Sequence, residues 1–204
     1  MSTVIIDYGM GNLISVKRAF EECGADVIIS DNPDDLSSAS HIVLPGVGAF
    51  ADGMSALHAA GWVKSIQRAV EEEEAALLGI CLGMQLLADS GVEGGEAAGL
   101  GMIPGQVVRL ESGESGERIP HVGWNEIWPQ QQHALFEHIA DGSDFYFVHS
   151  YHFITSDPAF VLSTTPYCRG FTSAVGKGRI MGVQFHPEKS QRSGFQLIRN
   201  FLSI

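Results

Sequence analysis

Ala75-Ala76-Leu77-Leu78-Gly79-Ile80-Cys81-Leu82-Gly83 is the stretch that decides the fold. Its apolar run over residues 75–80 predicts a buried strand, and residues 84–88 predict the start of a helix. The cysteine between two glycines has the G-x-C-x-G form of a nucleophile elbow, with cysteine in place of serine. We therefore expect a strand that turns sharply at Cys81 into a helix.

A thiol at this turn has two possible roles. At a helix N-terminus the macrodipole favours the thiolate, which is the reactive form, so Cys81 is a candidate nucleophile. Free cysteines are also among the most buried residues, and a purely structural Cys81 is the alternative. The stretch alone does not decide between the two.

Strands and helices alternate through the first half of the chain. Short apolar runs predict strands over residues 3–7, 26–30 and 41–44, in addition to the run before Cys81. Apolar residues at helical spacing predict helices over residues 13–23 and 62–70. Repeated strand–helix units predict a parallel sheet that is covered by helices on both faces.

The second half is richer in strands. Strand-like runs occupy residues 107–110, 123–128, 145–151, 161–165, 171–175 and 180–185. Residues 176–178 (Gly-Lys-Gly) predict a hairpin, residues 91–101 and 111–117 predict loops, and residues 195–202 predict a closing helix. We expect an α/β fold with a mixed, largely parallel sheet, antiparallel strands in the second half, and one domain over residues 1–204.

The composition limits the class of protein. The 204 residues are 45% hydrophobic and 18% charged, as expected for one globular domain, and the net charge of −12 argues against a nucleic-acid surface. Three cysteines without a C-x-x-C pair favour a reducing compartment and argue against zinc. We see no basic leader and no apolar run of roughly 18–20 residues, so we expect a cytoplasmic protein with no metal and no cofactor.

A cysteine nucleophile needs a base and a group that orients the base. His186-Pro187-Glu188 follows the predicted strand over residues 180–185. Residues i and i+2 of an extended segment project to the same side, so Glu188 can hold one ring nitrogen of His186 and leave the other for Cys81. Both segments follow strands, and open α/β sheets place their sites at the carboxyl ends of strands. A surface ion pair is the alternative for His186 and Glu188 taken alone.

Acyl transfer also needs donors for an oxyanion. In elbow enzymes one donor is the backbone N–H after the nucleophile, here that of Leu82, and another comes from a loop after an earlier strand. Residues 45–50 (Pro-Gly-Val-Gly-Ala-Phe) fit that loop, and the glycines around Val47 allow its peptide to reorient. A plain turn is the alternative.

Three segments together resemble the class I glutamine amidotransferases: residues 45–48, residues 79–87 and residues 182–188. Members of that family hydrolyse glutamine through a Cys-His-Glu triad and pass the ammonia to a synthase. The resemblance implies a γ-glutamyl thioester on Cys81, His186 as the general acid and base, and Glu188 as its orienting group.

Further segments resemble the glutaminase subunits of imidazole glycerol phosphate synthase: residues 7–13, 120–125, 146–151 and 188–190. This resemblance implies a heterodimer with a separate (βα)8-barrel cyclase subunit, which receives the ammonia for histidine biosynthesis and whose phosphoribosyl carboxamide ligand stimulates the glutaminase. Matching positions imply glutamine contacts from Gly48, Gln85, Glu93, Ser150 and Tyr151. They imply contacts with the cyclase from Asn12, Trp124, Tyr146 and Lys189.

Other functions remain open at this point. The alternatives are a glutaminase of another pathway, such as pyridoxal phosphate synthesis, a stand-alone γ-glutamyl hydrolase, and a catalytically silent docking module. We also expect low basal activity, because the hinge around Val47 could complete the oxyanion hole only in the liganded complex.

Overall fold

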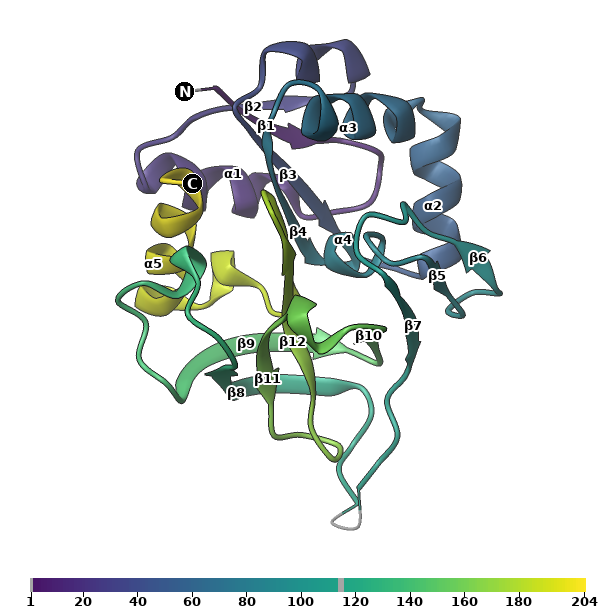
Figure 1. Ribbon diagram of the computed structural model, residues 1–204, viewed down its shortest axis with the longest axis vertical. Helices are drawn as coiled ribbons and strands as arrows, with labels where there is room; N and C mark the ends of the chain where they lie inside the picture. Colours follow the sequence, from purple (N-terminus) through teal and green to yellow (C-terminus); the bar gives the residue numbers. More distant parts are fainter. Residues whose placement is uncertain (1, 114–115) are drawn as a thin grey trace.

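The computed structural model describes residues 2–113 and 116–204, and across these residues thirteen strands form one sheet. Its parallel part has the order β2-β1-β3-β4-β13, as Figure 1 shows. These strands are β1 (Ser2–Ile6), β2 (Asp26–Ser30), β3 (His41–Gly46), β4 (Ala76–Cys81) and β13 (Ile180–Val183).

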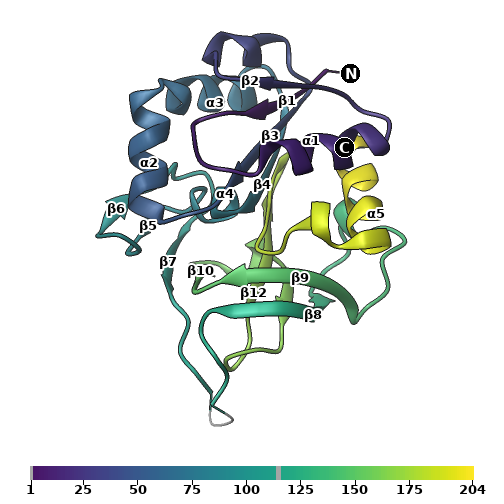
Figure 2. The same ribbon diagram turned by 180° about the vertical axis from the view of Figure 1, so that it is seen from behind.

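Helices cover both faces of the parallel part, as both views show (Figures 1 and 2). One face carries η1 (Pro33–Ser38), α2 (Phe50–Ala59) and α3 (Trp62–Glu71), and the other carries α1 (Leu13–Glu22) and α5 (Gln191–Leu202). Alternation along the strands explains this: Val4 and Ile6 of β1 pack into the first layer, whereas Ile5 packs into the second. None of the helices within the described ranges combines the length and the apolar character that crossing a bilayer requires.

The sheet continues from β13 through β12, β10 and β7 to β5 and β6, and every pairing on this path is antiparallel except that of β7 with β5, which is parallel. Strand β11 joins β12 to the β8–β9 pair. These strands are β5 (Ser90–Gly91), β6 (Ala97–Ala98), β7 (Gly105–Arg109), β8 (His121–Pro129), β9 (Ser143–His149), β10 (Tyr151–Thr155), β11 (Val161–Thr165) and β12 (Phe171–Lys177). Short helical segments are α4 (Leu82–Gln85), η2 (Ala134–Phe136), η3 (Pro158–Phe160) and η4 (Pro187–Lys189). The predicted α/β class with its mixed sheet is confirmed, and the single domain over 1–204 stays a prediction.

The last strand, β13, returns to the centre of the sheet. It pairs in parallel with β4, with Ile80 opposite Val183. Cys81 follows Ile80 directly, and His186 follows Val183 by three residues. The two segments that carry the predicted catalytic side chains therefore leave the same edge of the sheet side by side.

Several predicted elements differ in extent. The predicted strand over 145–151 is two strands that break at Ser150, because β9 pairs with β8 whereas β10 pairs with β7 and β12. The predicted loop over 91–101 contains β6, and helix α2 was not predicted. The hairpin turn lies one residue later than predicted, since Lys177 pairs with Ile180. Residues 114–115 of the predicted loop over 111–117 lie outside the described residues.

The helix predicted after Cys81 is short. α4 ends at Gln85, and Leu87 and Ala88 continue in tight turns, in which their N–H groups donate to Met84 and Gln85 carbonyls at 3.2 and 3.0 Å. Both residues are fully buried, so the chain turns back into the core after one turn. The macrodipole of this single turn is correspondingly small.

Candidate active site

Cys81 has a strained backbone. Its φ of 55° and ψ of −109° are values that a residue with a side chain rarely adopts. Such strain costs on the order of 1–3 kcal/mol and persists only where the surrounding structure enforces it. The predicted sharp turn from strand to helix is therefore present, and it presents the thiol at the carboxyl end of β4.

The glycines on either side of Cys81 are required by close packing. A Cβ on Gly79 would lie 2.6 Å from the Gly83 carbonyl oxygen, and a Cβ on Gly83 would overlap the Leu44 carbonyl oxygen of β3. Because backbone atoms cannot move aside as a flexible side chain can, only glycine fits at both positions. The G-x-C-x-G pattern thus follows from the close approach of β4 to the start of α4 at Gly79 and from the packing of the turn against β3 at Gly83.

His186 and Glu188 form a buried pair beside the elbow. His186 Nδ1 lies 2.8 Å from Glu188 Oε1, and the two side chains are 5% and 2% exposed. Burial alone would lower the pKa of His186, but its interactions with Cys81 and then with Glu188 outweigh burial and raise the pKa to about 10. Its other nitrogen, Nε2, is buried and without a hydrogen-bond partner. The ring can therefore carry a proton that an ionised Cys81 has released, and it has one nitrogen free to deliver that proton.

A cavity of about 400 Å³ opens onto Cys81. It is lined by both predicted oxyanion residues, all five predicted glutamine contacts and four residues that the sequence did not single out. The predicted ones are Val47, Leu82, Gly48, Gln85, Glu93, Ser150 and Tyr151, and the others are Ala49, Pro120, Val148 and His149. At Gly48 the φ of 116° is one that side chains disfavour, so the loop beside the cavity depends on glycine there.

Two of the predicted glutamine contacts are constrained by the protein itself. Gln85 is 3% exposed, and its Nε2 donates to the Tyr151 carbonyl at 3.0 Å and to Gln184 Oε1 at 3.1 Å. With both N–H groups used, only the amide oxygen of Gln85 is left for a ligand. Burial raises the pKa of the Glu93 carboxyl above its ordinary value.

Sequence reasoning missed Gln184, although it lies within the segment 182–188 that resembles the family. Gln184 Nε2 donates to Cys81 Sγ at 3.7 Å, and the side chain is fully buried. The signal that could have found it is its place in that segment, two residues before the predicted catalytic His186. Val148, whose carbonyl oxygen lies 3.9 Å from Cys81 Sγ, also belongs to a segment that resembles the family, residues 146–151, but was not proposed individually.

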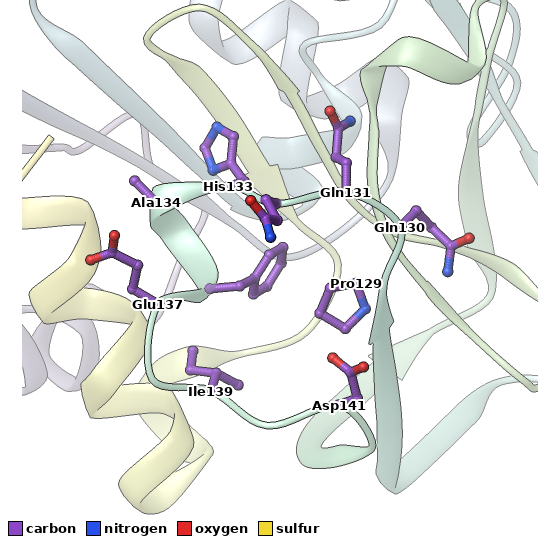
Figure 3. A pocket seen from close by; sticks show the side chains of 10 residues that line it. Pro129, Gln130, Gln131, His133, Ala134, Glu137, Ile139 and Asp141 are labelled. Atoms are coloured by element: carbon purple, nitrogen blue, oxygen red, sulfur yellow. The ribbon is translucent and has the colours of Figure 1, made fainter.

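A larger cavity lies elsewhere and contains none of the predicted site residues. It measures about 750 Å³ and is lined by residues of the segment 129–141, around the connection between β8 and β9 (Figure 3). In the parts of the chain that the structure describes, no three or more His, Cys, Asp or Glu residues gather where they could hold a metal ion. Cys81 and the predicted oxyanion and glutamine residues thus lie together at the smaller cavity.

The four predicted partner contacts divide into two places. Trp124 and Tyr146 lie opposite each other on β8 and β9 with their rings 6.0 Å apart, and Lys189 Nζ lies 5.6 Å from the Tyr146 ring. Asn12 instead caps α1, where its Oδ1 accepts from the Ser15 N–H at 3.4 Å. Helix α1 contacts η4, the segment that bears Lys189.

The outer face of β8 and β9 carries an exposed apolar patch next to the Glu126–Asp144 pair. Val122, Trp124 and Val148 are 57%, 48% and 37% exposed, and Val122 pairs with Val148 across the two strands. Together with Tyr146 these residues form what we call the β8–β9 face. Large exposed apolar side chains that adjoin one another are typical of interaction surfaces.

Comparisons with known proteins agree on one family. Residues 4–204 match the family model described as glutamine amidotransferase class-I. Proteins named imidazole glycerol phosphate synthase subunit HisH are 47% identical in Moorella thermoacetica (97% of this chain, 92% of the relative) and 44% identical in Aquifex aeolicus (98% and 96%).

Solved structures show the same fold at low identity. A crystal structure of a glutamine amidotransferase superposes with a TM-score of 0.77 at 21% identity, covering 98% of this chain and 97% of that one. A glutamine amidotransferase from Thermotoga maritima superposes with a TM-score of 0.67 at 20% identity, covering 100% and 83%. From the family match and the nearly full-length relatives, this chain belongs to the class I glutamine amidotransferases, in the branch of imidazole glycerol phosphate synthase subunit HisH.

Proposed function

We propose that this chain is the glutaminase subunit of imidazole glycerol phosphate synthase, which hydrolyses L-glutamine to glutamate and ammonia. One observation carries the chemistry: Cys81 and the His186–Glu188 pair leave neighbouring parallel strands at one edge of the sheet. The relatives that bear the HisH name support the pathway.

Cys81 is the nucleophile in this proposal. Its proton passes to His186, and the thiolate attacks the side-chain amide carbon of glutamine to form a tetrahedral intermediate. His186 returns the proton to the leaving nitrogen, so that ammonia departs and a γ-glutamyl thioester remains. His186 then takes a proton from water, which attacks the thioester and releases glutamate and the Cys81 thiol. Glu188 keeps the ring oriented and stabilises its protonated form.

The oxyanion of the intermediate needs two donors. The Leu82 N–H follows the nucleophile directly, and the Val47 N–H belongs to the loop on the other side of the cavity. The peptide that carries the Val47 N–H joins it to Gly46, a residue without a Cβ, which favours reorientation of that peptide. We expect low basal activity because the Val47 and Leu82 donors are both in place only in the liganded complex.

The amino-acid end of glutamine occupies the rest of the cavity. The amide oxygen of Gln85 and the carboxyl of Glu93 are acceptors for the substrate ammonium. Gly48, Ser150 and Tyr151 complete the walls around the substrate. A cavity of about 400 Å³ accommodates a ligand of this size.

The partner in this proposal is a (βα)8-barrel cyclase subunit that forms a heterodimer with this chain and receives the ammonia. The β8–β9 face is the contact surface, with Lys189 and Asn12 at its margin. It adjoins the cavity, because Val148 belongs to both. A cytoplasmic location for the complex stays a prediction.

The test measures glutamate release from glutamine by this chain alone, with the cyclase subunit, and with the cyclase and its phosphoribosyl carboxamide ligand. We expect a large rise only in the complete mixture. High and equal release in all three mixtures indicates an autonomous hydrolase and contradicts the pathway. No release in any mixture contradicts the glutaminase itself.

A further inference from the structure

A continuous chain of hydrogen bonds runs through buried and partly buried polar groups beside the Cys81 cavity. Starting from β8, it passes through Asn125, His121, His149, the Tyr151 carbonyl, Gln85 and Gln184 to Cys81 Sγ. The triad uses only the last of these atoms, so the chain requires its own explanation.

The direction of every bond follows from the Tyr151 carbonyl, which can only accept. Gln85 must present its NH₂ group to this oxygen at 3.0 Å, and the second N–H of that group donates to Gln184 Oε1 at 3.1 Å. Gln184 must therefore turn its own NH₂ group toward Cys81, where Nε2 lies 3.7 Å from Sγ. The sulfur thus faces a fixed donor.

The two histidines hold the other side of the same carbonyl. His149 Nδ1 lies 2.8 Å from the Tyr151 oxygen and must donate to it, which leaves His149 Nε2 as the acceptor for His121 Nδ1 at 3.1 Å. His121 Nε2 then accepts from Asn125 Nδ2 at 3.3 Å. Burial lowers the pKa of both histidines, to about 3 for His149 and about 4 for His121, so both stay neutral and keep these tautomers.

We propose that Gln184 is a further catalytic residue, whose amide N–H stabilises the Cys81 thiolate. Gln85 and His149 are positioning residues that fix the direction of this donor through the Tyr151 carbonyl. A hydrogen bond from a neutral N–H to a charged acceptor is roughly twice as strong as one between neutral groups, so the bond favours the ionised sulfur.

The other groups around the sulfur make this donor necessary. The Val148 carbonyl, 3.9 Å from Sγ, accepts from the thiol and repels the thiolate. Burial, and then the charge of Cys81, raise the pKa of Tyr8, so that phenol stays neutral. The protonated ring of His186 and the amide of Gln184 both favour the ionised form.

Thiol reactivity tests the proposal without requiring turnover. Gln184→Met removes the donor at similar length, and Gln184→Glu replaces it with an acceptor. Gln196→Met is the matched control, since that amide also donates to a side-chain oxygen, Asn200 Oδ1 at 2.8 Å, but lies on α5. Alkylation by iodoacetamide is followed for the Cys81 peptide by mass spectrometry at pH 7 and pH 10, with Cys23 as the internal reference.

For Gln184→Met we expect Cys81 alkylation at pH 7 to fall about tenfold, the effect of losing one charge-assisted hydrogen bond, and to recover at pH 10. Gln184→Glu falls at least as far, and Gln196→Met retains the parental rates. An unchanged rate at pH 7 overturns the proposal. So does an equal loss at both pH values, because that pattern reports packing or access rather than ionisation.

A second pair of variants tests His149 as a positioning residue. It also tests the proposal if the Gln184 variants do not fold. The amide nitrogen of asparagine imitates Nδ1 of histidine, whereas that of glutamine imitates Nε2. His149→Asn should therefore keep the bond to Tyr151 and slow the alkylation of Cys81 at pH 7 less than His149→Gln, which loses that bond. Equal rates in the two variants overturn the role of His149.

The inference rests on the proposed glutaminase function only in the claim that thiolate formation at Cys81 contributes to catalytic turnover. Glutamate release by the unaltered complex is measured in parallel, so the proposed function and the proposed thiolate donor can be contradicted independently. No release, together with a slowed Gln184→Met, contradicts the function and leaves the thiolate donor supported. Normal release, together with an unchanged Gln184→Met, contradicts the donor alone.

Discussion

Glu188 accepts from His186 Nδ1 at 2.8 Å and is one of the two groups that raise the pKa of that ring. Glu188→Gln keeps the shape but removes the charge, so the ring is held less firmly in its protonated form. Glutamate release by the full complex should fall by up to the order of 10⁴-fold, as after loss of the orienting carboxylate of a triad. Glu137→Gln, at an exposed acid, is the control, and a Glu188→Gln variant that retains a tenth of the activity would contradict the assignment.

At Gly83 the packing of the fold depends on the absence of a single carbon atom, the Cβ. A Cβ at this position overlaps the Leu44 carbonyl oxygen, so Gly83→Ala must displace β3 or the elbow. Overpacking of this kind costs typically 1–3 kcal/mol or more, and we expect a lower midpoint in urea unfolding. Gly24→Ala is the comparison, because its Cβ meets nothing within 4 Å although φ is 90°. Equal losses of stability in Gly83→Ala and Gly24→Ala would argue against the overlap at Gly83.

At the scale of elements, the β8–β9 pair presents two exposed tryptophans from one strand. Trp124 is 48% exposed and lies against Tyr146, whereas Trp128 is 43% exposed and lies over Gly142, near the far end of β8. If the β8–β9 face binds the cyclase, Trp124→Ala should weaken binding by about 30-fold or more, the effect of a hot-spot residue. Trp128→Ala should change binding little.

Isothermal titration with the cyclase subunit distinguishes these outcomes. Both tryptophans are half exposed, so neither substitution should unfold the chain, and thermal unfolding of each variant checks this. If Trp128→Ala weakens binding of the cyclase more than Trp124→Ala does, the interface lies closer to the β8–β9 connection than we propose.

For the whole molecule, the buried histidines His121 and His149, together with His41, whose pKa burial also lowers, predict how stability depends on pH. In the unfolded chain His121 and His149 would titrate near 6.5, whereas in the fold burial lowers the pKa of His149 to about 3 and of His121 to about 4. As pH falls below about 6.5, the unfolded state binds protons that the native state does not. The free energy of unfolding should therefore fall, by about 1.4 kcal/mol per pH unit for each histidine once the unfolded form is fully protonated.

His186 acts in the opposite sense. Its folded-state pKa of about 10 is raised, so its contribution to stability is complete below pH 6.5 and is lost only as pH rises toward 10. Urea unfolding at pH 7, 6, 5 and 4.5 measures the slope. His149→Asn should reduce the slope of unfolding free energy against pH, whereas His58→Asn, at an exposed histidine, should leave the slope unchanged. Parallel plots of unfolding free energy against pH for the parent and His149→Asn would contradict the prediction.

The sequence by itself determined the local elements and the residues with reactive chemistry. Hydrophobic periodicity predicted the strands before Cys81 and His186 and the helices α1, α3 and α5, because each of these patterns lies within one short segment. The G-x-C-x-G form and the two-residue spacing of His186 and Glu188 also depend only on neighbours in the chain. The segments that resembled a known family supplied the substrate.

The tertiary structure decided what depends on contacts between distant segments. Only the pairing of β13 with β4 brings His186 beside Cys81, and only the separate partners of β9 and β10 divide the chain at Ser150. The donor of Gln184 is directed by a carbonyl on another strand, through an amide on a third segment. Hydrogen-bond direction and strand order are set by groups far apart in sequence, and a local pattern carries no information about them.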